Sequence, residues 1–257
     1  MRYDRRFPVG GSLASSFFPT GVKWLLIINI ALFVVYFLVV NTGISSLAYV
    51  FSGPLGLALR PAAVLQFLAL WQVVTYMFLH DPTGFSHILF NMFSLWMFGA
   101  DLERAWGTRR FLKFYFVCGV GAGLCVIAGS ILFGGMHAPT IGASGAIYGL
   151  LMAFGILYPD RVILFSFLFP IKAKYFVLII GAITFLSTLG STGSGVSHIA
   201  HLGGLIFGYF YLKGLRTGRR FQLGFAIQDR YRQWKIDRAK KKFQVYMRKN
   251  DPDRWVH

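Results

Sequence analysis

Ser144 is the residue whose surroundings best suit chemistry. It stands in the run Gly142-Ala143-Ser144-Gly145, which opens an apolar segment. The neighbouring glycines leave the serine hydroxyl uncrowded. If a helix begins here, the backbone N–H groups of its first turn have no acceptor within the helix and are available to a negatively charged oxygen. This combination is typical of a nucleophile that needs hydrogen-bond donors for an oxyanion.

A nucleophilic serine needs a base within hydrogen-bond reach, and His201 is the candidate. Two pairs of glycines at four-residue spacing, Gly145 with Gly149 and Gly204 with Gly208, allow apolar helices to approach closely. His201 lies about one turn before Gly204 on the same helix face. If the two glycine faces meet, the imidazole ring comes beside the serine hydroxyl.

His87 and Asn91 supply further hydrogen-bond donors. They are four residues apart and therefore share one face of a helix. An imidazole and a side-chain amide, together with the backbone N–H of Ser144, predict an oxyanion hole. Tyr148, one turn after the serine, is predicted to lie on the same face of its helix.

The remaining histidines are expected to take no part in the reaction. His198 lies one turn from His201 and is expected to pack or to face water. His80 and His137 lie between apolar segments and are expected at the surface. A lone Gly-x-Ser-Gly run also arises by chance in glycine-rich helices. The serine, two histidines and one asparagine at matched membrane depth together favour a reactive site.

These residues must be positioned by helices in a membrane. The 257-residue chain is 56% hydrophobic and only 14% charged, which is more apolar surface than a water-soluble domain can bury. A helix that spans a bilayer needs about 20 apolar residues. Six segments are predicted to form such helices: 24–41, 86–104, 111–133, 144–158, 175–190 and 197–214. The fourth segment is short, which suits a helix enclosed by the others.

Basic residues indicate the orientation of these helices. They concentrate before the first segment, in the second-to-third and fourth-to-fifth connections, and after the sixth segment, within a formal charge of +17. Basic loops remain in the cytoplasm, so both termini are predicted to be cytoplasmic. This orientation places Ser144, His87 and the start of the sixth helix near the outer leaflet.

The chain is expected to comprise a cytoplasmic segment 1–23, a six-helix domain 24–215 and a basic cytoplasmic tail 216–257. Prolines and glycines interrupt the apolar connection 42–85, which predicts a partly embedded loop of short helices. Aromatic and basic residues alternate in the tail, which leaves two interpretations open. It is a helix on the anionic lipids of the inner leaflet, or a solvated basic extension. Nucleic acid is not an expected partner.

Several motifs resemble the rhomboid family of intramembrane serine proteases, and the resemblance covers nearly the whole membrane region. The matching stretches are His87-Ile88-Leu89-Phe90-Asn91, Gly99 with Glu103, Gly142-Ala143-Ser144-Gly145 with Tyr148, and Ala200-His201-Leu202-Gly203-Gly204 with Gly208. Their order agrees with the topology that charge and hydropathy predict.

The resemblance implies an all-α membrane protein whose six transmembrane helices form a rhomboid-like bundle with a partly embedded first loop. It implies a dyad of Ser144 and His201 without an aspartate, oxyanion donors on His87, Asn91 and Ser144, and supporting roles for Tyr148, Gly142, Gly145, Gly204 and Gly208. The substrates implied are transmembrane segments of membrane proteins. The implied location is a cell (inner) membrane that the chain crosses several times, and no cofactor or metal is expected.

Two details follow from the same resemblance. It implies a mobile fifth helix and a cap loop at about 190–195. The family often carries Trp-Arg in the first loop, whereas this chain has Trp71-Gln72. We therefore expect the buried hydrogen bonds of that arginine to the loop to be missing, which concerns the rigidity of the loop and not the chemistry.

Other functions fit these residues less well than proteolysis. A rhomboid-like pseudoprotease would bind membrane clients without cutting them, but such members usually lose the serine or the histidine. A metalloprotease on His87, His198 and His201 lacks both a His-Glu-x-x-His motif and a membrane carboxylate as general base. A transporter would need ionisable residues along a path at mid-bilayer, and an aspartyl protease would need paired membrane aspartates. The sequence offers neither.

Overall fold

The computed structural model describes residues 17–43, 45–165, 169–190 and 195–216, together with Trp234 and Arg238. The chain divides into two units, Met1–Tyr211 and Leu212–His257. Most of the expected N-terminal segment, most of the cap loop and most of the basic tail lie outside the described residues. In the second unit, Trp234 and Arg238 are helical, and the guanidinium carbon lies 5.0 Å from the centroid of the indole ring.

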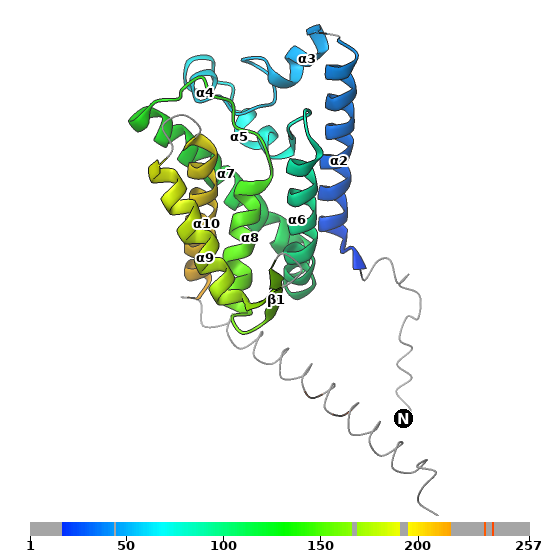
Figure 1. Ribbon diagram of the computed structural model, residues 1–257, viewed down its shortest axis with the longest axis vertical. Coiled ribbons are helices and arrows are strands. Elements are labelled where there is room, and N and C mark those ends of the chain that lie inside the picture. Colours follow the sequence, from blue (N-terminus) through cyan, green and yellow to red (C-terminus); the bar gives the residue numbers. More distant parts are fainter. Residues whose placement is uncertain are drawn as a thin grey trace, which may run out of the picture. The chain divides into compact units, whose positions relative to one another are not determined.

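Six longer helices account for most of the described residues (Figure 1). They are α2 (Thr20–Asn41), α6 (Phe85–Trp106), α7 (Thr108–Phe133), α8 (Ser144–Leu157), α9 (Ala173–Gly190) and α10 (Gly195–Arg216). The predicted mostly helical fold is confirmed. Glycines set several of the boundaries: α6 lies between Gly84 and Gly107, and α7 ends before Gly134.

Two of the described helices, α2 and α7, are long and apolar enough by themselves to cross a membrane. Shorter apolar helices cover Ser144–Leu157 and Ala173–Thr188. The helices α6 and α10 carry the polar residues of the predicted site, which lowers their mean hydropathy. That all six helices cross the bilayer therefore stays a prediction.

The outer surface of the helices is strongly apolar. Exposed large side chains include Ile27, Ile28, Ile30, Val34 and Val35 on α2, and Leu178, Ile179, Ile183, Phe185 and Leu186 on α9. Contiguous apolar surface of this kind is unfavourable in water and is compatible with a lipid environment.

The helix α8 is enclosed by its neighbours. It packs against α6, α7 and α9, and its glycines contact those of α10. Ala146, Leu150 and Phe154 are buried along its length. Because protein surrounds it, the helix needs only 14 residues.

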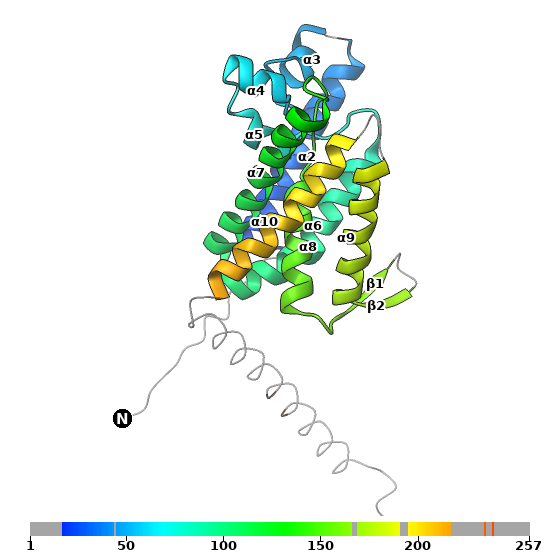
Figure 2. The ribbon, with the colours of Figure 1, turned by 90° about the vertical axis from the view of Figure 1, so that its left-hand side faces the viewer.

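The connection between α2 and α6 contains short helices, as the sequence predicts. They are α3 (Ser45–Ser52), α4 (Pro61–Phe67), α5 (Gln72–Thr75) and the 3-10 helix η1 (Tyr76–Phe78). The helices α3, α4 and α5 lie at one end of the longer helices (Figures 1 and 2).

Gln72 makes the loop hydrogen bonds that were expected to be missing, so that expectation was wrong. Its side chain is completely buried. The amide nitrogen Nε2 donates to the carbonyl oxygens of Pro54 at 2.8 Å and Gly56 at 3.1 Å. Its Oε1 accepts from the Arg60 N–H at 2.9 Å, and the Trp71 indole also donates to the Gly56 oxygen. A glutamine thus ties the loop together because it carries both donors and an acceptor.

A small β-hairpin, which the all-α prediction missed, connects α8 to α9. The strands β1 (Val162–Phe165) and β2 (Phe169–Lys172) are antiparallel, with Val162 opposite Lys172. The hairpin lies at the end of the helices opposite α3, α4 and α5 (Figure 2). Its β-branched and aromatic residues favour strands, but the run is too short to be distinguished from a loop by sequence.

Glu103, near the end of α6, holds the start of α2. Its side chain is buried, and its two carboxylate oxygens accept hydrogen bonds from the Gly21 and Val22 N–H groups, each at 2.7 Å. The Thr108 hydroxyl donates to the same carboxylate at 2.6 Å. A Cβ atom on Gly21 would lie only 3.1 Å from the carboxylate oxygens. A negative charge at a helix N-terminus is favourable, so this contact fixes α2 against α6.

Glu103→Gln is expected to lower the free energy of unfolding by about 2–4 kcal/mol, because an amide nitrogen would then face a backbone N–H in a buried site. Thr108→Ala removes a single hydrogen bond and should lower it by about 1 kcal/mol. Unfolding in mild detergent, followed by circular dichroism, measures both values. Equal stability of Glu103→Gln and the wild type would contradict a role for the carboxylate in holding α2.

Candidate active site

Ser144 is the first residue of α8 and follows a tight turn. Gly142 has a φ of +116°, a backbone conformation that favours glycine. The Gly142 N–H donates to the carbonyl oxygen of Tyr76 at 2.9 Å, which ties the turn to η1. The first helical hydrogen bond of α8 runs from the Ile147 N–H to the Ala143 oxygen at 3.1 Å. The backbone N–H groups of Ser144, Gly145 and Ala146 therefore have no acceptor within the helix.

His201, on α10, lies beside this serine. Its Nε2 is 2.7 Å from the Ser144 Oγ. The Tyr148 ring stacks on the imidazole with centroids 4.2 Å apart and an angle of 4° between the planes. Thr184 of α9 donates in turn to the Tyr148 hydroxyl at 3.4 Å. None of the acidic side chains in the described residues bonds to the His201 ring.

Glycines allow the close approach that brings the serine and the histidine together. A Cβ atom on Gly204 would overlap the Gly145 carbonyl oxygen. One on Gly208 would lie 3.0 Å from the Gly149 Cα. The two glycine stripes of α8 and α10 therefore lie against each other. Any larger residue in place of Gly204 would force the two helices apart and lengthen the distance between Ser144 and His201.

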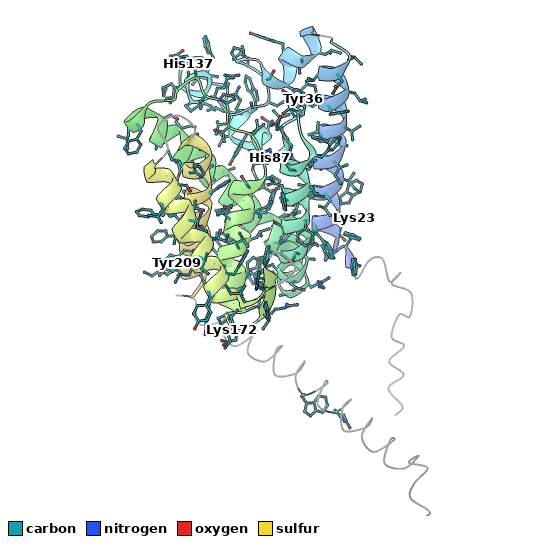
Figure 3. The ribbon with its side chains drawn as sticks, viewed as in Figure 1. Lys23, Tyr36, His87, His137, Lys172 and Tyr209 are labelled. Atoms are coloured by element: carbon teal, nitrogen blue, oxygen red, sulfur yellow. The ribbon has the colours of Figure 1, made fainter. Side chains whose placement is uncertain are left out.

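His87 lies against the turn that precedes the serine. A Cβ atom on Gly142 would be 2.9 Å from the His87 Nε2 and 3.8 Å from the Ser144 Oγ. Position 142 therefore requires glycine for two reasons: a side chain would collide with His87, and the positive φ favours glycine. In Figure 3, His87 lies toward the end of the helices that carries α3, α4 and α5, whereas Lys172 lies at the opposite end.

Asn91 follows His87 by one turn and is 7% exposed. Its Nδ2 donates to the His87 carbonyl oxygen at 2.8 Å, which leaves the second amide hydrogen available. Asn91 and Ser144 both line a cavity of about 780 Å³ between α6, α8 and α9. The remaining walls are mostly apolar and include Phe90, Met97, Leu151, Phe176 and Ile180. An apolar cavity with a few polar groups is typical of a binding site for a hydrophobic ligand.

The histidines outside this group have different surroundings. The ring of His198 lies 6.2 Å from that of His201, at an angle of 81°. His137 is exposed, as expected. His80 was expected at the surface and is instead completely buried, with its ring 5.1 Å from that of His87. Sequence reasoning placed it in a loop but had no signal that the loop folds over α6.

The buried His80 is uncharged at neutral pH. Burial, and to a lesser extent the neighbouring His87, lower the pKa of His80 to about 4. Neither of its ring nitrogens has a hydrogen-bond partner among the described residues. His80 therefore packs beside His87 as a neutral ring.

No three His, Cys, Asp or Glu side chains in the described residues form a group that could hold a metal ion. The polar groups that the structure gathers are instead one hydroxyl, two imidazoles and one amide. This set can transfer a proton between the serine and His201 and can donate hydrogen bonds to an oxyanion.

Comparison with known proteins identifies similar chains. The sequence-family model of the rhomboid domain matches residues 68–217, from the first loop to the end of α10. The chain is 35% identical over 140 residues to Rhomboid protease GluP of Bacillus subtilis, covering 54% of this chain and 25% of that protein. It is 30% identical over 154 residues to Rhomboid protein 1, mitochondrial, of Saccharomyces cerevisiae, covering 55% and 42%. It is 29% identical over 153 residues to Rhomboid protease GlpG of Yersinia pseudotuberculosis, covering 56% and 47%. The chain thus spans between a quarter and about half of the length of these relatives.

Proposed function

This chain belongs to the rhomboid family, and from that premise we propose that it is an intramembrane serine endopeptidase. Its substrates are transmembrane segments of membrane proteins. The observation that carries the proposal is the 2.7 Å separation between His201 Nε2 and Ser144 Oγ at the wall of an apolar cavity.

The reaction begins with attack of the Ser144 Oγ on a peptide carbonyl carbon. The hydroxyl proton passes to the His201 Nε2, and the carbonyl oxygen becomes an oxyanion. When the peptide bond breaks, His201 gives this proton to the leaving amine. Water then attacks the acyl-enzyme with the same histidine as base, which releases the acid and restores the serine.

The oxyanion accepts hydrogen bonds from three directions. The Ser144 backbone N–H comes from the first turn of α8, the Asn91 amide comes from α6, and the His87 ring lies beside Gly142. Such donors stabilise the transition state most when water is excluded. The buried position of Asn91 supports this role.

The Tyr148 ring positions the base. Its parallel stacking on His201 restricts rotation of the imidazole and keeps Nε2 directed at the serine. No carboxylate is needed to orient a ring that is already held by packing. A dyad without an aspartate is therefore sufficient in this geometry.

The substrate binds in the cavity between α6, α8 and α9, whose apolar lining suits a transmembrane segment. The segment must unwind locally, because a helix hides its carbonyl groups from attack. In this proposal the six helices of the domain 24–215 cross the cell membrane, both termini are cytoplasmic, and the tail 216–257 contacts anionic lipids. The apolar outer surfaces of α2 and α9 support the membrane location.

Cleavage of a single-span membrane protein by the purified full-length chain tests the proposal. We expect one cut within the transmembrane segment, mapped by mass spectrometry. A fluorophosphonate should label Ser144 and block the cut, whereas a metal chelator should have no effect. A substrate that copurifies with the chain but stays uncut under every condition would instead indicate a client-binding pseudoprotease.

A further inference from the structure

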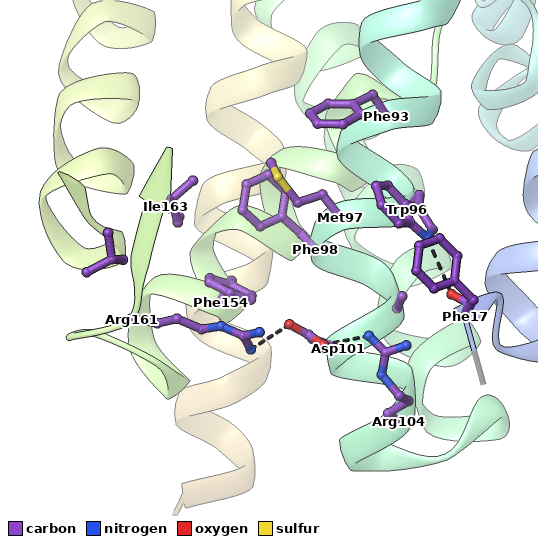
Figure 4. A pocket seen from close by; sticks show the side chains of 12 residues that line it. Phe17, Phe93, Trp96, Met97, Phe98, Asp101, Arg104, Phe154, Arg161 and Ile163 are labelled. Carbon is purple, nitrogen blue, oxygen red and sulfur yellow. Dashed lines mark hydrogen bonds and ion pairs between the residues drawn. The ribbon is translucent and has the colours of Figure 1, made fainter. Parts of the chain in front are cut away.

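A second cavity lies farther along α6, where residues from Phe93 to Arg104 line it (Figure 4). Its volume is about 380 Å³. Aromatic and aliphatic side chains form most of its wall, among them Trp96, Met97, Phe154 and Ile163. The polar part of the wall is a cluster of three charged side chains. The cavity therefore offers apolar and ionic surfaces together.

The charged cluster carries more positive than negative charge. The Asp101 carboxylate forms ion pairs with two guanidinium groups, with Arg104 at 2.7 Å and with Arg161 through its other oxygen. One carboxylate thus faces two cations, and the formal charges of these three side chains add up to +1. The Arg161 side chain is 49% exposed, so its guanidinium is accessible from outside.

Aromatic rings hold Arg161 in place. Its guanidinium carbon lies 5.5 Å from the centroid of the Phe154 ring and 5.8 Å from that of Tyr158. These distances are within the range of cation–π attraction. The backbone is also fixed, because the Arg161 carbonyl oxygen accepts from the Ala173 N–H at 2.8 Å. Arg161 therefore presents a positioned guanidinium rather than a freely moving one.

The surroundings add further positive charge. Val162, which lines the cavity, pairs with Lys172 in the hairpin. Lys172 and Lys174 both form ion pairs with the single carboxylate of Asp160, which again leaves a formal charge of +1. This end of the helices is the one opposite His87 (Figure 3). It carries the basic connections that are predicted to face the anionic cytoplasmic leaflet.

We propose that this cavity binds an anionic phospholipid, with Arg104 and Arg161 contacting the headgroup phosphate and the apolar wall contacting an acyl chain. The planar donor fork of a guanidinium matches phosphate oxygens. A free phosphate would leave the aromatic wall unused. A zwitterionic lipid would bring its own cation toward a site that is already positive.

The acyl chain has a continuous apolar surface to follow. Phe93, Met97, Phe98 and Ile163 line both this cavity and the larger cavity that contains Ser144. A lipid whose headgroup is bound by Arg104 and Arg161 would therefore place its chain along α6, next to the proposed substrate cavity.

Native mass spectrometry of the full-length chain in detergent tests this site, with phosphatidylglycerol and phosphatidylcholine as the lipids. We expect the wild type to retain phosphatidylglycerol preferentially. Arg161→Gln should weaken its binding about tenfold, or about 1.4 kcal/mol. Arg109→Gln is the matched control, because it removes the same charge from an exposed position of α7 outside the cavity. It should leave binding unchanged.

Asp101→Asn distinguishes a phosphate site from a purely structural ion cluster. Removal of the competing carboxylate should tighten phosphatidylglycerol binding, even if thermal stability falls. Unchanged or weaker binding by Asp101→Asn would overturn the proposal, as would equal retention by Arg161→Gln and Arg109→Gln. Equal retention of phosphatidylcholine, which carries the same phosphate together with a cation, would overturn the preference for an anionic lipid. Displacement by an equal concentration of glycerol 3-phosphate would overturn the contribution of the acyl chain, because the free anion would then suffice.

Discussion

Ser144→Ala and His201→Ala are each expected to abolish cleavage, with a loss of at least about 10⁴-fold in kcat. The physical reason is the 2.7 Å contact between the two side chains. Without the histidine the hydroxyl keeps its proton, and without the hydroxyl no acyl-enzyme forms. Each removal should therefore cost about as much as both together, because the two groups act as a unit.

His198→Ala is the matched control for the His201 variant. Its ring lies on the same helix, 6.2 Å from the His201 ring. We expect it to lower kcat less than about tenfold, or less than about 1.4 kcal/mol of barrier. Single-turnover cleavage at equal protein concentration, with a thermal melt for each variant, measures the difference. A larger loss in His198→Ala than in His201→Ala would show that His201 is not the base.

Asn91→Ala is expected to lower kcat by about 10²–10³-fold with little change in KM, because it removes a donor that acts on the oxyanion. His87→Ala should also lower kcat, because it removes an imidazole donor that lies beside Gly142 and Ser144. Both variants should still react with a fluorophosphonate, since the serine and its base remain.

The split between kcat and KM separates this role from a structural one. A packing defect in the cavity that Asn91 lines would weaken substrate binding and raise KM. Unchanged turnover in both Asn91→Ala and His87→Ala would sink the oxyanion assignment. Asn91→Asp has nearly the same shape but adds a negative charge beside the oxyanion, so it should be at least as slow as Asn91→Ala.

Local signals in the sequence were sufficient for the helices. The predicted segment 144–158 corresponds to α8, Ser144–Leu157, and 86–104 lies within α6, Phe85–Trp106. Apolar runs and the glycines that end them decide these boundaries. The spacing of Gly204 and Gly208 also indicated which face of α10 would approach α8, and both glycines contact that helix.

These local signals could not predict contacts between residues that are far apart in the chain. Glu103 meets Gly21 across 82 positions of the chain, and no periodicity reports such a pairing. The burial of His80 depends on how the first loop lies over α6. The hydrogen bonds of Gln72 were missed for a related reason. Its partners are backbone groups of Pro54, Gly56 and Arg60, which come near Gln72 only when the loop folds.

The enclosure of α8 has a consequence for how the protein responds to its lipid environment. None of its 14 residues, all of which the structure describes, is exposed. At about 1.5 Å per residue the helix is about 21 Å long, shorter than a hydrocarbon core of about 30 Å. In the proposed membrane arrangement, the apolar outer surfaces of α2 and α9 face lipid, and these helices take up a change in bilayer thickness by tilting. The depth of Ser144 is then set by helix packing, so the hydrophobic mismatch of a thinner or thicker membrane acts on the substrate and not on the nucleophile.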